Sequence, residues 1–162
     1  MKKFIIIIAA VFASVAANAQ YYAGGSLGVS LHDNVADKFG FSIAPEVGYE
    51  LSDNLAVGAV VEMRFGSKYS AFEIAPYVRY YFYELGPVRF FADGLFAYES
   101  FKWSGESSQT SWQLAVCPGI AIPVTDQISI VTHLGAIGYN DRTSRIECDI
   151  NPGARIGVLF AF

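Results

Sequence analysis

The sequence predicts an all-β protein: an eight-stranded antiparallel up-and-down transmembrane β-barrel. Three observations predict this fold: alternating apolar and polar residues in eight long runs, tight turns between alternate pairs of runs, and two aromatic bands on the apolar face. The chain has 162 residues, of which 53% are hydrophobic and only 16% are charged. After the first 17 residues no stretch of 18 apolar residues remains, which excludes a bundle of transmembrane helices.

Charge and composition exclude two further classes. The chain carries 15 acidic and 11 basic residues, a net charge of -4, and no cluster of Lys and Arg is longer than a pair. A nucleic-acid-binding surface needs concentrated positive charge, so we expect no nucleic-acid partner. The high apolar content also excludes an intrinsically disordered chain.

The N-terminus has the pattern of a secretory signal peptide. Lys2 and Lys3 precede an apolar run that begins at Phe4, and Ala17-Asn18-Ala19 is a small-residue cleavage site. We expect cleavage after residue 19, which leaves a barrel domain over residues 20–162 with a net charge of -6. A single membrane anchor fits less well, because the apolar run is short and no stop-transfer pattern follows.

Eight runs with a period of two follow along the mature chain. They cover residues 21–31, 39–51, 55–65, 72–82, 88–98, 112–124, 128–138 and 150–162. Each has 11 to 13 residues, longer than an ordinary soluble strand and long enough for a tilted strand to cross a bilayer. Tight turns at 52–54, 84–86 and 125–127 alternate with longer polar segments near 32–38, 66–71, 99–111 and 139–149. This alternation predicts an up-and-down meander.

The alternation also predicts which face of each strand meets lipid. Apolar and polar sides are marked, in the first four runs, by Leu27 and Ser30, Ile43 and Glu46, Val61 and Glu62, and Ile74 and Arg79. A soluble barrel would have to crowd the many apolar residues into a lumen that eight strands leave narrow. We therefore expect the apolar face to point outward to lipid and the charges to point inward, with closure of the sheet pairing every strand edge.

Aromatic residues on the expected outward face form two bands with an aliphatic belt between them. Toward the tight turns these are Tyr21, Tyr49, Tyr80, Phe82, Phe90, Phe160 and Phe162, and toward the loops Phe39, Phe41, Phe65, Phe72, Phe96, Tyr98 and Trp112. Such bands are typical of the two interfaces of a membrane barrel. Outward prolines recur in the even-numbered runs, at Pro45, Pro76, Pro118 and Pro152. We expect a local bulge or twist at each, because proline removes a ladder donor.

The inward charges are the one polar constellation, four of each sign. They are Glu46, Glu62, Glu73 and Asp93 against Arg64, Arg79, Arg89 and Arg155. Unpaired charge inside a narrow lumen is costly, so we expect these residues to pair and plug the barrel. The alternative is a gated pore for small ions, in which the pairs rearrange.

The chain resembles the eight-stranded outer-membrane barrels of the OmpA and OmpX type, over the whole mature part. The most specific likeness is the terminal strand, residues 155–162, in which Phe160 and the final Phe162 resemble the signal that such proteins present to the barrel-assembly machinery. The resemblance implies location in the cell outer membrane, exterior loops, periplasmic turns, and contact with outer-membrane lipid and lipopolysaccharide. It does not include the second, peptidoglycan-binding domain of OmpA.

We expect neither an enzyme nor a cofactor or metal site. A lipid-modifying barrel is the catalytic alternative, since an outer-membrane deacylase of this fold resembles a His and Ser two apart on one strand. Here His133 is followed by Gly135 in the position of that serine, so the base lacks its nucleophile. Cys117 and Cys148 fall on opposite faces of strands that are not neighbours, which argues against a disulfide.

The expected function is a structural or surface-interaction role at the cell envelope, carried out by a monomer. Trp103, in the longest expected loop, is the candidate exterior contact, because an exposed loop aromatic can anchor a partner. A small-solute pore is the main alternative function, and a lipid-modifying enzyme is a lesser one. The sequence does not identify the exterior partner.

Overall fold

The computed structural model describes residues 21–31, 39–66, 68–105, 107–149 and 155–162, so the expected signal peptide lies outside the described residues. The described chain is built of strands: β1 (Tyr21–Leu31), β2 (Phe39–Ser52), β3 (Leu55–Gly66), β4 (Tyr69–Leu85), β5 (Val88–Trp103), β6 (Gln109–Pro123), β7 (Ile128–His133), β8 (Ala136–Asn140), β9 (Arg145–Asp149) and β10 (Arg155–Ala161). Within it, no helix is long and apolar enough to cross a membrane.

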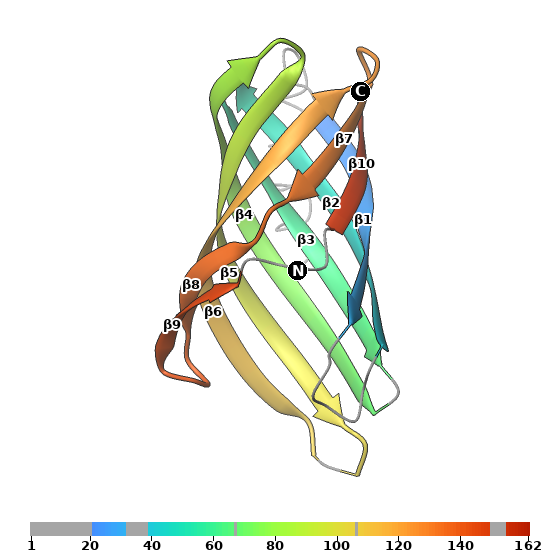
Figure 1. Ribbon diagram of the computed structural model, residues 1–162, viewed down its shortest axis with the longest axis vertical. Helices are drawn as coiled ribbons and strands as arrows, with labels where there is room; N and C mark the ends of the chain where they lie inside the picture. The colour runs from blue at the N-terminus through green and yellow to red at the C-terminus, as the bar shows by residue number, and fades with distance from the viewer. Residues whose placement is uncertain (1–20, 32–38, 67, 106, 150–154) are drawn as a thin grey trace, which may run out of the picture.

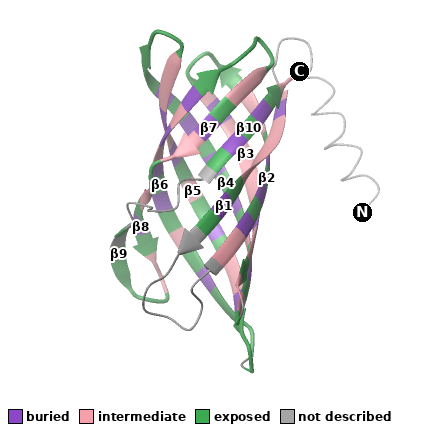
Figure 2. Cartoon of the chain, turned by 45° about the vertical axis from the view of Figure 1, so that its right-hand side comes forward, coloured by how far each residue is buried: buried purple, intermediate pink, exposed green. Residues whose placement is uncertain are grey.

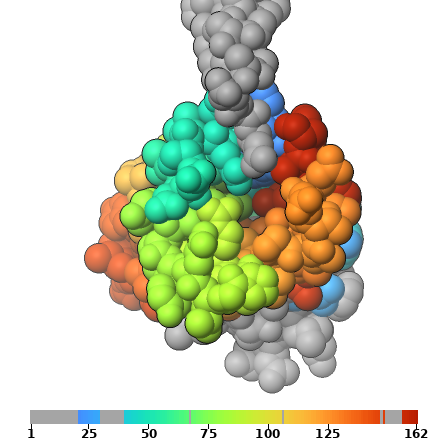
Figure 3. All heavy atoms as spheres, turned by 90° about the horizontal axis from the view of Figure 1, so that it is seen from above, coloured from blue at the N-terminus to red at the C-terminus, as the bar shows by residue number. Residues whose placement is uncertain are grey.

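The strands close into the predicted eight-stranded antiparallel barrel (Figure 1). Successive strands β1 to β7 pair in chain order, and β10 completes the ring between β7 and β1. Closure joins Tyr22 of β1 to Ala161 of β10, and β10 in turn pairs with β7 through Arg155 and His133. Seen from the turn end, the three tight turns surround the end of the barrel (Figure 3; teal, lime and orange). The seventh expected strand is divided into β7 and β8, and β9 forms within the expected loop 139–149, which is why ten strands are labelled.

The seventh expected strand breaks between His133 and Ala136, so residues 128–138 do not form one strand as predicted. Gly135 has a φ of 153°, a backbone conformation that is available mainly to glycine. The break shifts the alternation of faces, since Ile130 and Ile137 are both exposed although they are seven positions apart. Beyond it β8 continues the pairing with β6, and β9 pairs with β8, so this hairpin lies apart from β7 and β10 in Figure 1.

Three expected loops are largely strand, and one of them is 139–149, which belongs mostly to β8 and β9. β5 runs to Trp103 and β6 starts at Gln109, so most of the predicted loop 99–111 belongs to the barrel wall. The expected loop at 66–71 shortens in the same way, because β4 begins at Tyr69 and pairs with Trp103. The reason is that the alternation persists: Glu99 and Phe101 continue the inward face of β5, and pairing satisfies backbone groups that a loop would leave to water.

The expected outward orientation of the apolar face is confirmed (Figure 2). Along β4 the residues alternate between buried and exposed, with Tyr77 and Arg79 inside and Val78 and Tyr80 outside. The exposed side chains include most members of the two expected aromatic bands: Phe65, Phe72, Tyr80, Phe82, Phe96, Tyr98, Trp112, Phe160 and Phe162. The molecule therefore presents an apolar wall and encloses its charges.

The described ladders show no bulge at Pro45 or Pro76, whereas at Pro118 the pairing of β6 shifts by one residue, from Val116 with Ile137 of β8 to Gly119 with His133 of β7. At Pro45 and Pro76 the ladder to the next strand omits two residues and resumes in the same register. Proline lacks the N–H group, so the hydrogen bond is lost without an extra residue being inserted. The other register shifts lie nearer the turns, between Glu50 and Ser52 and between Tyr81 and Tyr83. Pro152 lies outside the described residues.

Glycines make room for the large inward rings. The rings of Tyr22 and Phe91 lie over Gly48 and Gly119, which are their cross-strand neighbours. A Cβ atom at either glycine would collide with the ring. The centre of the barrel is thus a packed core of aromatic rings, into which the charged side chains project.

Candidate functional site

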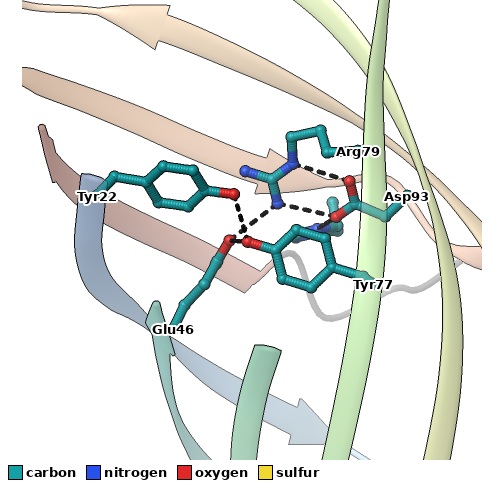
Figure 4. Close-up of polar contacts among 6 residues, drawn as sticks. Tyr22, Glu46, Tyr77, Arg79 and Asp93 are labelled. Atoms are coloured by element: carbon teal, nitrogen blue, oxygen red, sulfur yellow. Dashed lines mark hydrogen bonds and ion pairs between the residues drawn. The ribbon is translucent and has the colours of Figure 1, made fainter. Parts of the chain in front are cut away.

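The centre of the lumen holds a cluster of six inward side chains, the Arg79 cluster: Tyr22, Glu46, Tyr77, Arg79, Asp93 and His133 (Figure 4). They come from β1, β2, β4, β5 and β7, so the cluster links strands on opposite sides of the barrel. Each occupies an inward position of its strand, because the period of two sends alternate side chains to the lumen.

Arg79 is the centre of this cluster and is fully buried. Its Nε and Nη2 atoms each donate to one oxygen of Asp93 at 2.8 Å, the fork geometry of a bidentate pair. Nη2 also donates to Glu46 Oε1 at 3.1 Å. The guanidinium carbon lies 4.2 Å from the centre of the Phe91 ring and 5.0 Å from that of Tyr77. One cation is therefore shared by two buried carboxylates and held between aromatic rings.

Hydrogen bonds extend the cluster to both sides. The Tyr77 hydroxyl donates to Glu46, and the Tyr22 hydroxyl lies 2.7 Å from that of Tyr77. Because the Tyr77 proton is directed at the carboxylate, Tyr22 donates to Tyr77. On the other side His133 Nε2 lies 3.0 Å from Asp93 Oδ2. An ionised Asp93 can only accept, so His133 donates and an unbroken chain of hydrogen bonds crosses the lumen from β1 to β7.

A second cluster, the Arg64 cluster, lies toward the loop end and comprises Arg64, Tyr69, Glu73 and Glu99. Arg64 Nη2 is 2.7 Å from Glu73 and 3.0 Å from Glu99. The Tyr69 hydroxyl donates to Glu99 at 3.2 Å. The Arg64 side chain is 33% exposed, compared with 0% for Arg79. The Arg64 cluster is therefore partly accessible to water, whereas the Arg79 cluster is buried.

The other expected lumen charges lie outside these two clusters. Glu62 is buried on the inward face of β3, opposite Glu73. Arg89 lies at the turn end, where it pairs with the exposed Glu84 at 2.9 Å, donates to the backbone carbonyl of Asp53, and lies over the Tyr81 ring. The side chain of Arg155 lies outside the described part of the chain.

The balance of charge in the lumen differs from the expected equality. Glu50 and Glu99 are also on inward positions, so the described strands add two carboxylates to the four that were expected, without adding an arginine. Glu99 was assigned to a loop by the sequence reasoning, and the persistent alternation through Phe101 is the signal that would have found it. The described lumen therefore has an excess of negative charge.

Sequence reasoning missed the tyrosines of the Arg79 cluster, and it considered His133 as a possible catalytic base without placing it in the charge network. Tyr22 and Tyr77 supply the hydroxyl groups that complete the hydrogen bonding of Glu46. Each has the inward parity of the charges, and each faces a glycine across the strand pair, Gly48 and Gly58. That juxtaposition of an inward aromatic residue with a glycine is the signal available in the sequence, once the register is known.

Trp103 is partly exposed at the end of β5, and its ring centre lies 5.3 Å from that of Tyr69. It occupies a lumen-side position of the strand end, above the Arg64 cluster, instead of a long loop. Phe160 and Phe162 are exposed on the outer wall at the turn end. Among the described residues there is no group of His, Cys, Asp and Glu that could hold a metal ion.

The two cysteines lie on different sides of the wall. Cys117 is buried on the lumen side of β6, whereas Cys148 is exposed in β9. Strand β8 separates them, with Val116 paired to Ile137 and Ile137 paired to Cys148. The structure holds the two thiols apart, without a disulfide.

The closed ring of eight antiparallel strands, apolar outside and charged inside, is the fold of the small outer-membrane barrels. Neisserial surface protein A has this fold with a TM-score of 0.60 and 17% identity, over 89% of this chain and 96% of that one. The outer membrane protein Ail of Yersinia pestis, determined in a phospholipid bilayer nanodisc, has a TM-score of 0.52 at 12% identity, over 89% and 99% of the two chains. A major outer membrane protein of Thermus thermophilus has a TM-score of 0.52 at 13% identity, over 90% and 100%. No protein-family model and no curated protein sequence matches the chain.

Proposed function

We propose that this protein is an integral outer-membrane barrel with a structural or surface-interaction role, and that its lumen is closed by buried charge pairs. The observation that carries the proposal is the complete burial of Arg79 between Asp93 and Glu46. A solute that moves along the barrel axis would have to pass the Arg79 cluster. There the bidentate pair and the surrounding aromatic rings block the lumen.

Opening this level would be energetically costly. Each carboxylate would have to leave Arg79, and removal of one partner from a buried ion pair costs about 3–5 kcal/mol. The rings of Tyr22, Tyr77 and Phe91 form one buried cluster around the arginine, and Gly48 and Gly119 hold the Tyr22 and Phe91 rings close to the wall. Both the ionic and the aromatic packing thus support a closed lumen.

The outer wall supports the location in the membrane. Its apolar side chains are exposed over the whole circumference, which in water would be an aggregation hazard and in lipid is the ordinary state of a barrel. The expected signal peptide and the exposed terminal residues Phe160 and Phe162 support export and delivery to the barrel-assembly machinery. We propose a monomer in contact with outer-membrane lipid and lipopolysaccharide.

A surface-interaction role would use the loop end of β4 and β5. Tyr69 and Trp103 form an aromatic pair there, and more than half of the Trp103 surface is covered by the barrel itself. An aromatic residue that is partly held in place costs less conformational entropy when it binds a partner. We therefore keep Trp103 as the first candidate for an exterior contact.

A small-solute pore is the second candidate function, favoured by one observation. The Arg64 cluster is partly exposed and has two carboxylates for one arginine, which would favour cations if a path existed past Arg79. A lipid-modifying enzyme has less support. His133 is directed at Asp93 inside the lumen, away from the lipid that such an enzyme would modify.

Single-channel conductance in a planar bilayer tests the proposal. We expect the refolded mature protein to be silent, and an Arg64→Ala variant to be silent as well, because the seal lies at the Arg79 cluster. Both samples first need to show the heat-dependent gel mobility of a closed barrel. Steady wild-type conductance that Arg64→Ala changes would overturn the closed lumen and favour a cation-selective pore.

A further inference from the structure

The outer wall carries an apolar groove over β4, β5, β6 and β8. Its volume is about 530 Å³. The residues that form it include Pro76, Val78, Gly94, Phe96, Val116 and Ile137. All of these have apolar side chains or none, and all lie on the lipid-facing side of their strands. The groove is therefore an indentation of the lipid-facing wall and is unrelated to the charged lumen.

The sequence of β5 accounts for the groove. Four successive outward residues of this strand are Phe90, Ala92, Gly94 and Phe96. Two small residues thus lie between two large rings, over about 20 Å measured along the strand. Neighbouring outward residues of β4 and β6 are larger, since Val78 and Val116 both pair with Gly94. The result is a hollow at Gly94, with Val78 and Val116 at its sides and Phe96 at its loop end.

Gly94 is not required by the backbone or by close packing. It is not among the glycines with positive φ, and a Cβ atom added there would meet only the Val78 carbonyl oxygen, at 4.0 Å. At Gly24 and Gly138 an added Cβ would instead collide with the backbone of the next strand. Glycine within a strand is less favourable than alanine, because it loses more backbone entropy on folding and has no side chain to pack. The effect of glycine at position 94 is to leave the space of the groove unfilled, because it has no side chain.

We propose that this groove holds one lipid acyl chain. The inference rests on the membrane location given in the proposed function. The groove is continuous with the lipid-facing wall and lies between the two aromatic bands, at the depth of the hydrocarbon, where headgroups do not reach. An empty indentation there would lose dispersion contacts on one side, and a flexible hydrocarbon chain restores them. Inside a bilayer, association of a hydrocarbon chain with a protein depends on such packing. A bound acyl chain therefore stays in the groove for a longer time than on the flat wall.

The test is native mass spectrometry of the refolded protein released from nanodiscs of dimyristoylphosphatidylcholine. This zwitterionic lipid avoids attraction of an anionic headgroup to exposed basic residues. We expect the wild type to retain one lipid. Gly94→Leu, which fills the groove, should reduce the lipid-bound fraction at least fivefold, and Gly94→Ala should reduce it by a smaller factor. Ala23→Leu, which adds bulk at an outward position on the far strand β1, should retain the lipid as the wild type does.

The outcomes separate this inference from the proposed function. Equal retention by wild type and Gly94→Leu would overturn the acyl-chain site, as would loss of lipid in Ala23→Leu to the same extent, or pairing of two copies through β5 in the wild type. Heat-dependent gel mobility shows whether each variant is a closed barrel, and the Gly94→Ala variant supplies the graded answer if Gly94→Leu fails to fold. Channel conductance of the wild type would overturn the closed lumen and leave the lipid result unaffected.

Discussion

Replacement of Arg79 by methionine should destabilise the barrel strongly, because it removes the shared cation of two buried carboxylates. Arg79 makes three charge-assisted hydrogen bonds, two to Asp93 and one to Glu46. After the substitution Asp93 keeps only its bond from His133, and Glu46 keeps that from Tyr77. Loss of one partner from a buried pair costs about 3–5 kcal/mol, and we expect a loss in that range in the free energy of unfolding. Urea unfolding in lipid vesicles, followed by tryptophan fluorescence, measures it.

The neutral triple variant is the matched control. Arg79→Met combined with Glu46→Gln and Asp93→Asn removes the charges together, so no unpaired ion remains in the lumen. Since a buried ionic group is often replaceable by neutral groups of similar volume at little cost, most of the lost stability should return. The reasoning is refuted if Arg79→Met alone costs less than about 1 kcal/mol, or if the triple variant is no more stable than the single one.

Three further outcomes are expected. Gly119→Ala should cost about 1–3 kcal/mol in urea unfolding, because its Cβ would overlap the Phe91 ring; an unchanged midpoint would contradict the packing. Pro76→Ala should raise the free energy of unfolding by about 0.5–1.5 kcal/mol, because it returns an N–H group to the ladder with β5. A loss of stability in the same assay would show that β5 offers no acceptor to that N–H group. In the detergent-solubilised barrel a small detergent-permeant maleimide should label Cys148 rapidly and Cys117 only after unfolding; equal labelling rates would refute the placement of the two thiols.

Much of the fold could be predicted because a membrane barrel imposes a definite environment on each face of every strand. The alternation of apolar and polar residues survives along β1 to β6, and reading it is enough to direct Arg79 inward and Tyr80 outward. The division of the seventh strand could not be predicted in this way. Its cause is the backbone conformation at Gly135, and a glycine in a strand is compatible with either an unbroken or a broken ladder.

The sequence predicts which charged residues lie in the candidate site, but it does not predict all of the contacts between them. Parity places Glu46, Arg79 and Asp93 in one lumen. The Arg79 to Asp93 pair follows from the neighbouring strands β4 and β5, but the Arg79 to Glu46 contact joins β4 to β2 across an intervening strand. Such a contact depends on the curvature and stagger of the closed barrel, which single-strand periodicity does not contain. For the same reason the tyrosine hydroxyls that complete the cluster were overlooked.

The unequal strand lengths give the barrel a sloping rim, visible in Figure 1 where the β5–β6 hairpin (yellow) reaches farthest at the loop end. β1 has 11 residues and β5 has 16. At about 3.3 Å per residue and a tilt of about 40°, these strands rise roughly 28 Å and 40 Å along the barrel axis. The shorter side barely exceeds the apolar thickness of a membrane, whereas the taller side rises about 12 Å higher than the shorter one. Among the described residues, the β5–β6 hairpin, with Trp103 near its tip, is therefore the part of the loop end that stands farthest from the middle of the barrel.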